Sequence, residues 1–531
     1  MFAIRFKHCL GFPSRWSAAV RRFIGFVSLA ILIGAPSTVG AKEPGLFNQK
    51  SCWFTVPRDR DMTCGYLLVP ENRSKTDGRF IKLSIVIFEP DRERHEPVVY
   101  LTGGPGQPAQ IRSADDVEAW WSFIDNGAWL RGRRLIVFDQ RGVGMSAPSL
   151  SCAEHYNPQI WSGVVAHPGD VIDFDEAQKR EIRACRDDLL AKGIDLTAYN
   201  TKENAADVHD LQLALNVKKW VLFGISYGTK LALKVLEDHP DKIAAVVLDS
   251  TLPLDVNYVD QDAANFDRVL KKLDADCAAD ADCFHRMGSL KTLVSEIVQQ
   301  LDVQPVLLRL KGDDQSTSFT SVSGDDFIEL LFNQFYEREA IETLPQLIRR
   351  TADQDYRPLA EILGYEHSYD DSSTFSNGMH MSVVCSDGLP LAESSARFPL
   401  LDNWAKDNFY DWACLLWPSA KAVKVHKSHK QNEVPVLFLS GEYDPATPSV
   451  WAESVARDMG RSQLVLFHGV GHDVIDTTEC GGEVVSDFLE NPDAKIKTPC
   501  LADMASPQFI LPGNSGATVL TTVSTLPMAR R

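Results

Sequence analysis

The stretch Val221-Leu-Phe-Gly-Ile-Ser-Tyr-Gly-Thr229 decides how the rest of the chain is interpreted. Apolar residues typical of a buried strand lead into Gly-x-Ser-x-Gly, and a helix-forming segment follows. A strand-to-helix turn this sharp leaves no room for Cβ atoms beside the serine, which explains the two glycines. Because the turn lifts the hydroxyl of Ser226 clear of the sheet, the pattern predicts a nucleophilic serine.

A serine hydroxyl is a poor nucleophile without a base, and the base needs an orienting acid. In folds with this turn the order along the chain is Ser, then Asp or Glu, then His. The apolar stretch 434–440 runs into Asp444, and the apolar stretch 462–467 runs towards His472. Both residues are expected on loops at the carboxyl ends of successive strands, where α/β sheets place their active sites. We therefore predict Asp444 as the acid and His472 as the base.

Each of these two residues has a competitor. His468 also follows the stretch 462–467, but it lies earlier, where a side chain more often packs or caps. Asp249 ends the apolar stretch after the nucleophile helix, a position that some hydrolases use for the acid. The alternative role for Asp249 is structural, as a carboxylate that caps a loop. The sequence favours Asp444 and His472 and leaves both alternatives open.

Acyl transfer also requires N–H donors for the oxyanion that forms at the attacked carbonyl. One donor is expected from Tyr227, directly after the nucleophile, and the other from the loop after the third strand. That loop reads Thr102-Gly-Gly-Pro-Gly106, which is glycine-rich where substrate must approach the backbone. A turn that only reverses the chain is the alternative.

Apolar runs alternate with helical patterns such as 204–215 and 230–237, and this alternation predicts a mostly parallel, doubly wound α/β sheet. The predicted strands are 81–88, 98–101, 134–139, 220–224, 244–249, 434–440 and 462–467. Between Asp249 and Val434 the patterns are mainly helical, which predicts a helical cap inserted between the sixth and seventh core strands. The expected division is a signal peptide at 1–41, core at 42–255, cap at 256–430, the rest of the core at 431–505 and a peripheral tail at 506–531.

The first 41 residues have the order of a secretory signal peptide. A basic start precedes the apolar run 23–33, and small residues end at Ala41, after which cleavage is expected. An uncleaved N-terminal anchor is the alternative. With the signal removed, no stable membrane insertion is expected. The sequence therefore predicts a secreted or periplasmic protein.

The cysteines support export, because ten of the eleven follow the signal segment and fall into neighbours along the chain. The predicted disulfides are Cys52–Cys64, Cys152–Cys185, Cys277–Cys283, Cys385–Cys414 and Cys480–Cys500. Paired C-x-x-C motifs with zinc-ligand spacing are absent, so neither a metal nor a cofactor is expected.

The net charge of −18 argues against a nucleic-acid partner, since phosphate binding requires a basic surface. The expected partner is a peptide or small ester substrate, and the oligomeric state is left undetermined.

Three motifs together resemble the prolyl iminopeptidase and tripeptidyl aminopeptidase group of α/β hydrolases. They are Gly103-Gly-Pro-Gly106 after one strand, Asp139-Gln-Arg-Gly142 after the next, and Gly224-Ile-Ser-Tyr-Gly-Thr229; residues around Cys385 and Cys414 are similar to the tripeptidyl-aminopeptidase branch. The resemblance spans roughly residues 50 to 505. It implies an α/β-hydrolase fold and a secreted serine exopeptidase that removes short peptides or single residues from free N-termini.

By the same resemblance Ser226, Asp444 and His472 correspond to the catalytic triad, and Gly104 with Tyr227 to the oxyanion hole. Prolyl iminopeptidases usually begin the glycine motif with His, whereas this chain has Thr102, which weakens a strictly proline-specific interpretation.

An aminopeptidase must bind an ammonium group at a fixed distance from its nucleophile, which calls for a carboxylate in the cap. Asp387, beside the predicted disulfide Cys385–Cys414, is the first choice, and an ordinary surface or capping carboxylate is the alternative. A carboxylesterase with the same triad is the second candidate function, because the group also contains esterases. A non-catalytic hydrolase-like binding protein is a remote third.

Overall fold

The computed structural model describes residues 45–256, 258–312, 316–368, 374–387, 398–401, 404, 409–420 and 433–511. The predicted signal peptide and its cleavage site lie outside these residues, as does the tail from residue 512. Within the described ranges, no helix has the length and apolarity needed to cross a bilayer.

A nine-stranded sheet forms the centre of the core, in the order β1-β2-β3-β5-β4-β7-β8-β11-β12. Neighbours from β5 to β12 pair in parallel, whereas β1, β2 and β3 form an antiparallel edge that joins β5. The strands are β1 (Phe47–Lys50), β2 (Met62–Pro70), β3 (Phe80–Phe88), β4 (Val98–Leu101), β5 (Leu135–Phe138), β7 (Trp220–Ile225), β8 (Ile243–Asp249), β11 (Val436–Gly441) and β12 (Ser462–Phe467). All seven predicted strands are present, and the sequence missed β1 and β2.

Helices cover both faces of this sheet, as predicted for a doubly wound fold. Apolar residues on one face of the strands pack with α4 (Thr201–Ala214), α5 (Tyr227–Asp238) and α15 (Ser449–Arg457). Alternate residues of the same strands pack with α1 (Ala114–Asn126) and α17 (Glu479–Glu490) on the other face. Strands β4, β5, β7 and β11 are buried throughout, which explains why their sequences read as continuous apolar runs.

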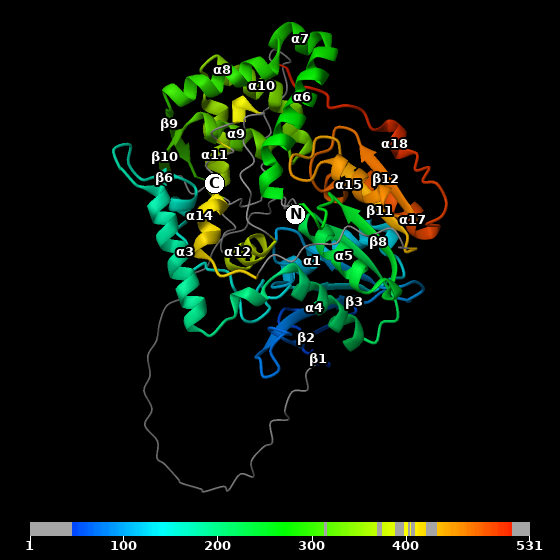
Figure 1. The fold of residues 1–531 in the computed structure, drawn as a ribbon. Coiled ribbons are helices and arrows are strands. Elements are labelled where there is room, and N and C mark those ends of the chain that lie inside the picture. The colour runs from blue at the N-terminus through cyan, green and yellow to red at the C-terminus, as the bar shows by residue number, and fades with distance from the viewer. Residues whose placement is uncertain are drawn as a thin grey trace, which may run out of the picture.

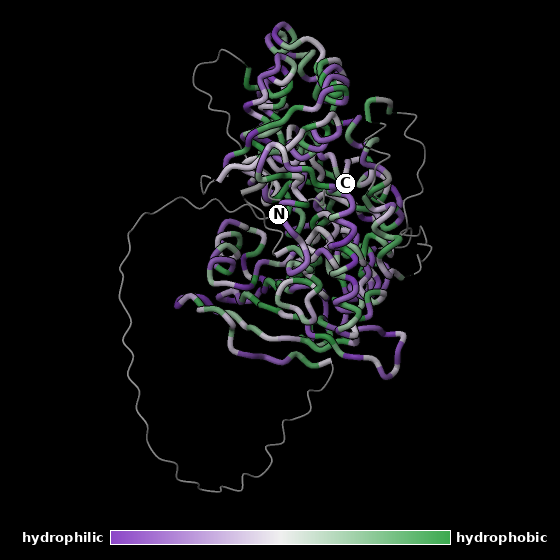
Figure 2. The backbone as a smooth tube through the Cα atoms, turned by 90° about the vertical axis from the view of Figure 1, so that its left-hand side faces the viewer, coloured by the Kyte–Doolittle hydropathy of each residue, from purple (hydrophilic) through white to green (hydrophobic). Residues whose placement is uncertain are grey.

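The insertion between β8 and β11 forms the cap, which lies on one side of the sheet in Figure 1. The insertion was expected between the sixth and seventh core strands, whereas it follows the seventh of the nine sheet strands in chain order. Its elements are α6 (Asp262–Ala279), α7 (Ala281–Met287), α8 (Leu290–Val303), β9 (Val306–Lys311), β10 (Thr317–Val322), α9 (Gly324–Gln334), α10 (Arg338–Ala352), α11 (Arg357–Ser368), α12 (Asn377–Ser386) and α14 (Phe409–Leu416). Hydrophilic and hydrophobic stretches alternate along the chain of the cap (Figure 2); the apolar faces of α6 to α11 share one hydrophobic cluster, and those of α12 and α14 belong to a second cluster with α3 (Phe174–Ala191).

A segment from the expected core interval 42–255 packs with the cap instead. It contains α2 (Pro158–Trp161), β6 (Val164–Val165) and α3 (Phe174–Ala191), and it lies between β5 and β7 in the chain. β6 pairs with β10, so that β6, β10 and β9 form a second sheet within an otherwise helical cap. The sequence missed this sheet because β6 has only two residues and its partner lies far along the chain.

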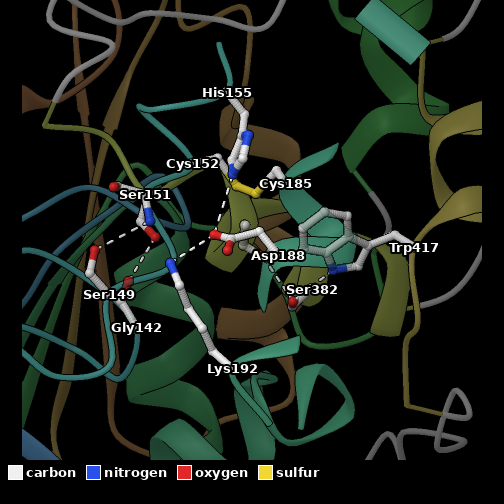
Figure 3. The surroundings of a disulfide bond; sticks show 12 residues. Gly142, Ser149, Ser151, Cys152, His155, Cys185, Asp188, Lys192, Ser382 and Trp417 are labelled. Carbon is white, nitrogen blue, oxygen red and sulfur yellow. Dashed lines mark hydrogen bonds and ion pairs between the residues drawn. A yellow bond between two sulfur atoms is a disulfide. The ribbon is translucent and has the colours of Figure 1, made fainter. Parts of the chain in front are cut away.

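The five predicted disulfides are confirmed: the structure pairs Cys52–Cys64, Cys152–Cys185, Cys277–Cys283, Cys385–Cys414 and Cys480–Cys500. Figure 3 shows Cys152–Cys185 beside His155 and Asp188, with Ser382 and Trp417 nearby. At the C-terminal end, residues 506–511 of the expected peripheral tail contact the cap, because the Ile510 N–H donates to the Glu342 carbonyl (2.8 Å).

Candidate active site

Ser226 stands at the turn between β7 and α5, in the strand–turn–helix arrangement that the sequence predicts. Its φ of 56° is in the left-handed region, which is strained for a residue with a side chain. A Cβ on Gly224 would overlap the Gly228 carbonyl, and one on Gly228 would overlap the Leu101 carbonyl. Both glycines are therefore required by close backbone approach, and Ser226 is the partly exposed residue within a buried stretch.

Asp444 and His472 are brought together from loops after β11 and β12. Asp444 Oδ2 lies 2.9 Å from His472 Nδ1, and Asp444 is completely buried. Because a carboxylate can only accept, Nδ1 carries the proton in this hydrogen bond and Nε2 keeps its lone pair. Thr447 donates its hydroxyl to the same carboxylate oxygen (2.6 Å) and its N–H to the other (2.8 Å). The pair has the arrangement of a base oriented by an acid.

The electrostatics of this pair favour an ion pair once His472 is protonated. Burial raises the pKa of Asp444, but the His472 charge and the hydrogen bonds outweigh burial and leave the pKa below its ordinary value. Burial lowers the pKa of His472, but the Asp444 charge and hydrogen bond outweigh it and leave the pKa above 6.5. An imidazolium formed during reaction would thus be stabilised in place.

The two alternative residues, His468 and Asp249, have other hydrogen-bonding and ion-pair partners. His468 is half exposed, and its Nδ1 lies 3.3 Å from Glu442 Oε2. Asp249, at the end of β8, accepts the N–H groups of Val474 (2.9 Å) and Ile475 (2.8 Å), directly after the His472 loop. Burial and the neighbouring Asp473 raise the pKa of Asp249 to about 7.

Asp249 also connects the base loop to the nucleophile. Its carbonyl accepts the N–H of Ser226 (3.0 Å), and the hydroxyl of the next residue, Ser250, accepts the N–H of Asp473 (2.8 Å). Asp249 and Ser250 therefore hold the residues that follow His472 in register with the nucleophile turn. Asp249 has the geometry of a loop-capping carboxylate, the structural alternative for this residue.

The glycine-rich loop after β4 lies against the nucleophile. A Cβ added to Gly103 would lie 3.1 Å from Ser226 Cβ and 3.7 Å from Ser226 Oγ. Gln140 Nε2 donates to the Thr102 carbonyl (3.1 Å) and hydroxyl (2.9 Å), and the Thr102 hydroxyl donates to the Gln107 carbonyl (3.1 Å). The segment 102–106, which contains Gly104, thus borders Ser226. Tyr227 directly follows Ser226 in the chain. The expected oxyanion donors therefore both lie near the expected nucleophile.

Asp387, the expected anchor for a substrate ammonium, already has a cationic partner. Its Oδ2 lies 2.7 Å from the ammonium of Lys230, a buried residue of α5 that also donates to the Val256 carbonyl (3.0 Å). A substrate ammonium would have to displace Lys230 from this pair. The structure therefore favours the alternative interpretation of Asp387 as a structural carboxylate.

A different acidic residue of the cap, Glu337, lies near the base. The carbonyl of the preceding Tyr336 accepts the N–H of His472 (3.0 Å), and the Tyr336 ring centroid is 4.9 Å from that of the imidazole. Burial, Asp473 and Glu339 raise the pKa of Glu337, and His472 lowers it. The sequence around Glu337 does not distinguish it from the other acidic residues of the insertion, because only docking of the cap brings it to His472.

No three His, Cys, Asp or Glu side chains in the described residues are grouped as they are around a bound metal ion. Within those residues, the Asp444 carboxylate and the His472 imidazole are joined by a hydrogen bond of 2.9 Å. A pair of this kind is suited to accept the proton of a nucleophilic hydroxyl.

Comparisons with known proteins identify the family and its relatives. The family described as the alpha/beta hydrolase fold matches residues 96–478. Serine protease Hip1 of Mycobacterium tuberculosis is 23% identical over 452 residues, covering 80% of this chain and 84% of the relative. Tripeptidyl aminopeptidase of Streptomyces coelicolor is 25% identical over 495 residues, covering 85% and 84%. Carboxylesterase B of Mycobacterium tuberculosis is 24% identical over 509 residues, covering 87% and 95%.

Proposed function

Because the chain belongs to the α/β-hydrolase family, we propose that it is a serine peptidase acting near free N-termini through an acyl-enzyme on Ser226. The observation that carries this proposal is the buried Asp444–His472 hydrogen bond, joined through Asp249 to the Ser226 turn. The similarity to relatives named serine protease and tripeptidyl aminopeptidase supports peptide bonds as the target.

In this mechanism Ser226 Oγ attacks the scissile carbonyl while His472 Nε2 takes the hydroxyl proton. N–H groups of Gly104 and Tyr227 stabilise the oxyanion. The C–N bond then breaks, and His472 gives its proton to the departing amine. Water, activated by the same imidazole, attacks the acyl-enzyme and restores Ser226. Asp444 stays ionised throughout and orients the ring.

Covalent labelling with a serine-reactive probe tests the identity of the nucleophile independently of the substrate. A fluorophosphonate probe should label the protein, and Ser226→Ala should abolish both labelling and hydrolysis. Label that persists on the alanine variant would assign the nucleophile to another residue.

Recognition of a free α-amino group is the finer part of the proposal, and Glu337 is its candidate anchor. Glu337 is half-buried, directly follows Tyr336, whose carbonyl accepts the His472 N–H, and has neither Lys nor Arg within ion-pair distance among the described residues. Pairing of an ammonium with a desolvated carboxylate is worth about 2–4 kcal/mol, or roughly 30- to 1,000-fold in efficiency. N-acetylated peptidyl-anilides should therefore be cleaved more slowly than their free-amine parents by that factor.

The carboxylate variants identify the anchor. Glu337→Gln should bring the ratio of free to acetylated rates close to one, whereas Glu339→Gln, an exposed control in the first turn of α10, which Glu337 precedes, should leave it unchanged. Asp387→Asn should also leave the ratio unchanged, because Asp387 pairs with Lys230. If Asp387→Asn removes the preference and Glu337→Gln does not, Asp387 is the anchor.

A carboxylesterase with the same triad is the second candidate, favoured by the similarity to carboxylesterase B over 87% of the chain. A panel that compares aminoacyl- and peptidyl-anilides with simple acyl esters distinguishes the two. Equal rates on blocked and free peptides, together with fast turnover of acyl esters, would establish the esterase.

We also propose that the protein is exported. Five disulfides support this, since such bonds persist in oxidising compartments. N-terminal sequencing of the protein recovered from the periplasmic and culture fractions should find a chain that begins after Ala41. An intact N-terminus on a membrane-bound protein would indicate an anchor.

A further inference from the structure

A cap helix packs directly on the glycine-rich loop beside the nucleophile. The N–H of Ser376, at the start of α12, donates to the Gly106 carbonyl (2.9 Å), and its hydroxyl donates to the Gly142 carbonyl (2.7 Å). A Cβ on Gly106 would lie 2.7 Å from the Ser376 carbonyl oxygen, so glycine at this position allows the close contact. The loop at residues 102–106 is therefore held by the cap as well as by the core.

His380, one turn further along α12, makes the side-chain contact to this loop. Its Nδ1 lies 2.9 Å from the Pro105 carbonyl oxygen and its Nε2 lies 2.6 Å from the Tyr410 hydroxyl. Because a carbonyl can only accept, Nδ1 must carry the proton, and a neutral ring then accepts the Tyr410 hydroxyl at Nε2. Burial lowers the pKa of His380 to about 4, which keeps the ring neutral and this tautomer in place.

The support behind His380 is rigid. Tyr410 belongs to α14, which the Cys385–Cys414 disulfide ties to α12. Trp417, just after α14, donates its indole N–H to the Ser382 hydroxyl (2.9 Å), a contact drawn in Figure 3. The imidazole is thus fixed at both nitrogens by groups whose own positions are constrained.

We propose that His380 is a positioning residue for the oxyanion hole. By holding the Pro105 carbonyl, it fixes the orientation of the loop at residues 102–106, and hence the direction of the Gly104 N–H towards Ser226. An oxyanion donor acts only if it already points at the place where charge develops. The inference rests on the proposed role of Ser226, but it applies equally to peptide and ester substrates.

The test compares His380→Ala with His380→Asn. Removing a whole oxyanion donor costs about 100- to 1,000-fold in kcat, so loosening one should cost about 10- to 100-fold, with KM within about threefold. The amide N–H of asparagine reaches the position of Nδ1 and should restore most of the activity. Tyr410→Phe, which frees Nε2, should give a smaller loss than His380→Ala.

Two readouts separate positioning from a general loss of structure. The affinity of a boronic acid inhibitor, measured on the titrated active fraction, should fall with kcat/KM, because the inhibitor reproduces the oxyanion. His155→Ala is the matched control, since His155 lies 3.3 Å from Asp188 beside the Cys152–Cys185 disulfide (Figure 3). It should leave inhibitor affinity unchanged.

The outcomes for this proposal and for the proposed function are distinct. If His380→Ala is labelled by fluorophosphonate at the wild-type rate, or if the alanine and asparagine variants are equally impaired, the positioning role is wrong. An effect confined to KM would indicate that His380 contacts the substrate, and this result would also contradict the positioning role. Wild-type protein that is labelled at Ser226 but cleaves only esters would refute the peptidase and leave the His380 comparison intact.

Discussion

Asp444 carries its charge where solvent does not reach, and four hydrogen bonds compensate for the lost hydration. The donors are the N–H groups of Ala446 and Thr447, the Thr447 hydroxyl and His472 Nδ1. An unpaired buried charge would cost several kcal/mol, so these contacts keep the carboxylate ionised and acting on the imidazole. The same four contacts distinguish Asp444 from Asp249, whose described acceptor contacts are to Ser250 and two backbone amides.

Replacing Asp444 with asparagine should reduce turnover by about 10⁴-fold, because the amide favours the wrong imidazole tautomer. The fold should survive, as judged by circular dichroism and by the melting temperature. Asp249→Asn is the comparison. It retains one acceptor oxygen for the loop after His472, so we expect a smaller loss of kcat. If Asp249→Asn is the more damaging substitution, the acid has been assigned to the wrong residue.

The pH dependence of kcat/KM should report the titration of His472 in the free enzyme. Only the neutral imidazole can accept the Ser226 proton, so activity should rise with pH. Burial lowers the pKa of His472, but Asp444 raises it further, so the midpoint should lie above 6.5. In Asp444→Asn the raising charge is gone and the midpoint of the residual activity should move to lower pH. An unchanged midpoint would contradict the coupling.

At the scale of elements, each loop of the candidate site receives a hydrogen bond from the cap. Arg268 of α6 donates to the carbonyls of Glu442 (3.0 Å) and Asp444 beside the acid. Arg338 of α10 donates to the His468 carbonyl (3.0 Å) on the base loop, and α12 contacts the glycine-rich loop. The cap is therefore part of the framework of the site as well as its cover.

Arg268→Met tests this framework at the acid. Two loop carbonyls would lose their donor, at about 1–3 kcal/mol for each one that stays buried, and the Asp444 loop would be freer to move. We expect a lower melting temperature and a lower kcat. Lys271→Met, an exposed position on α6, is the control and should change stability by no more than about 0.5 kcal/mol. Equal effects of the two substitutions would refute a specific role for Arg268.

For the whole molecule, the five disulfides each link residues that are close in sequence, with separations from 6 to 33. Each crosslink therefore stabilises one region, and packing joins the regions to one another. Cys52–Cys64 lies at the antiparallel edge of the sheet, and Cys480–Cys500 joins α17 to α18 (Cys500–Asp503). The cap and its partner segment contain the other three.

The loop lengths predict unequal contributions to stability. On the chain-entropy model, Cys152–Cys185 should contribute about 4 kcal/mol and Cys277–Cys283 about 2 kcal/mol. Replacing both cysteines of each pair with serine should therefore lower the melting temperature more for Cys152–Cys185. Calorimetry measures the shift, and peptide mapping under non-reducing conditions checks that the other four bonds remain. The reverse order would show that native-state packing outweighs loop entropy here.

The sequence alone was sufficient wherever structure depends on neighbouring residues. Strands β4 and β12 begin and end where their apolar runs do, and the glycines around Ser226 identify the turn. The loops of Asp444 and His472 follow from strand ends, because parallel strands present their carboxyl ends at one edge. The disulfide pairs follow from short separations, since a nearby cysteine has the smallest entropy to lose.

Only the tertiary structure decided which distant groups meet. It paired Asp387 with Lys230, joined β6 to β10, directed Asp249 to the amides after His472, and placed Glu337 and His380 beside the site. None of these contacts leaves a local pattern, because an acidic residue or a histidine on a helix looks the same whether it faces solvent or a neighbouring loop. Docking of the cap on the core selects between those two environments. It depends on burial summed over many residues from separate parts of the chain.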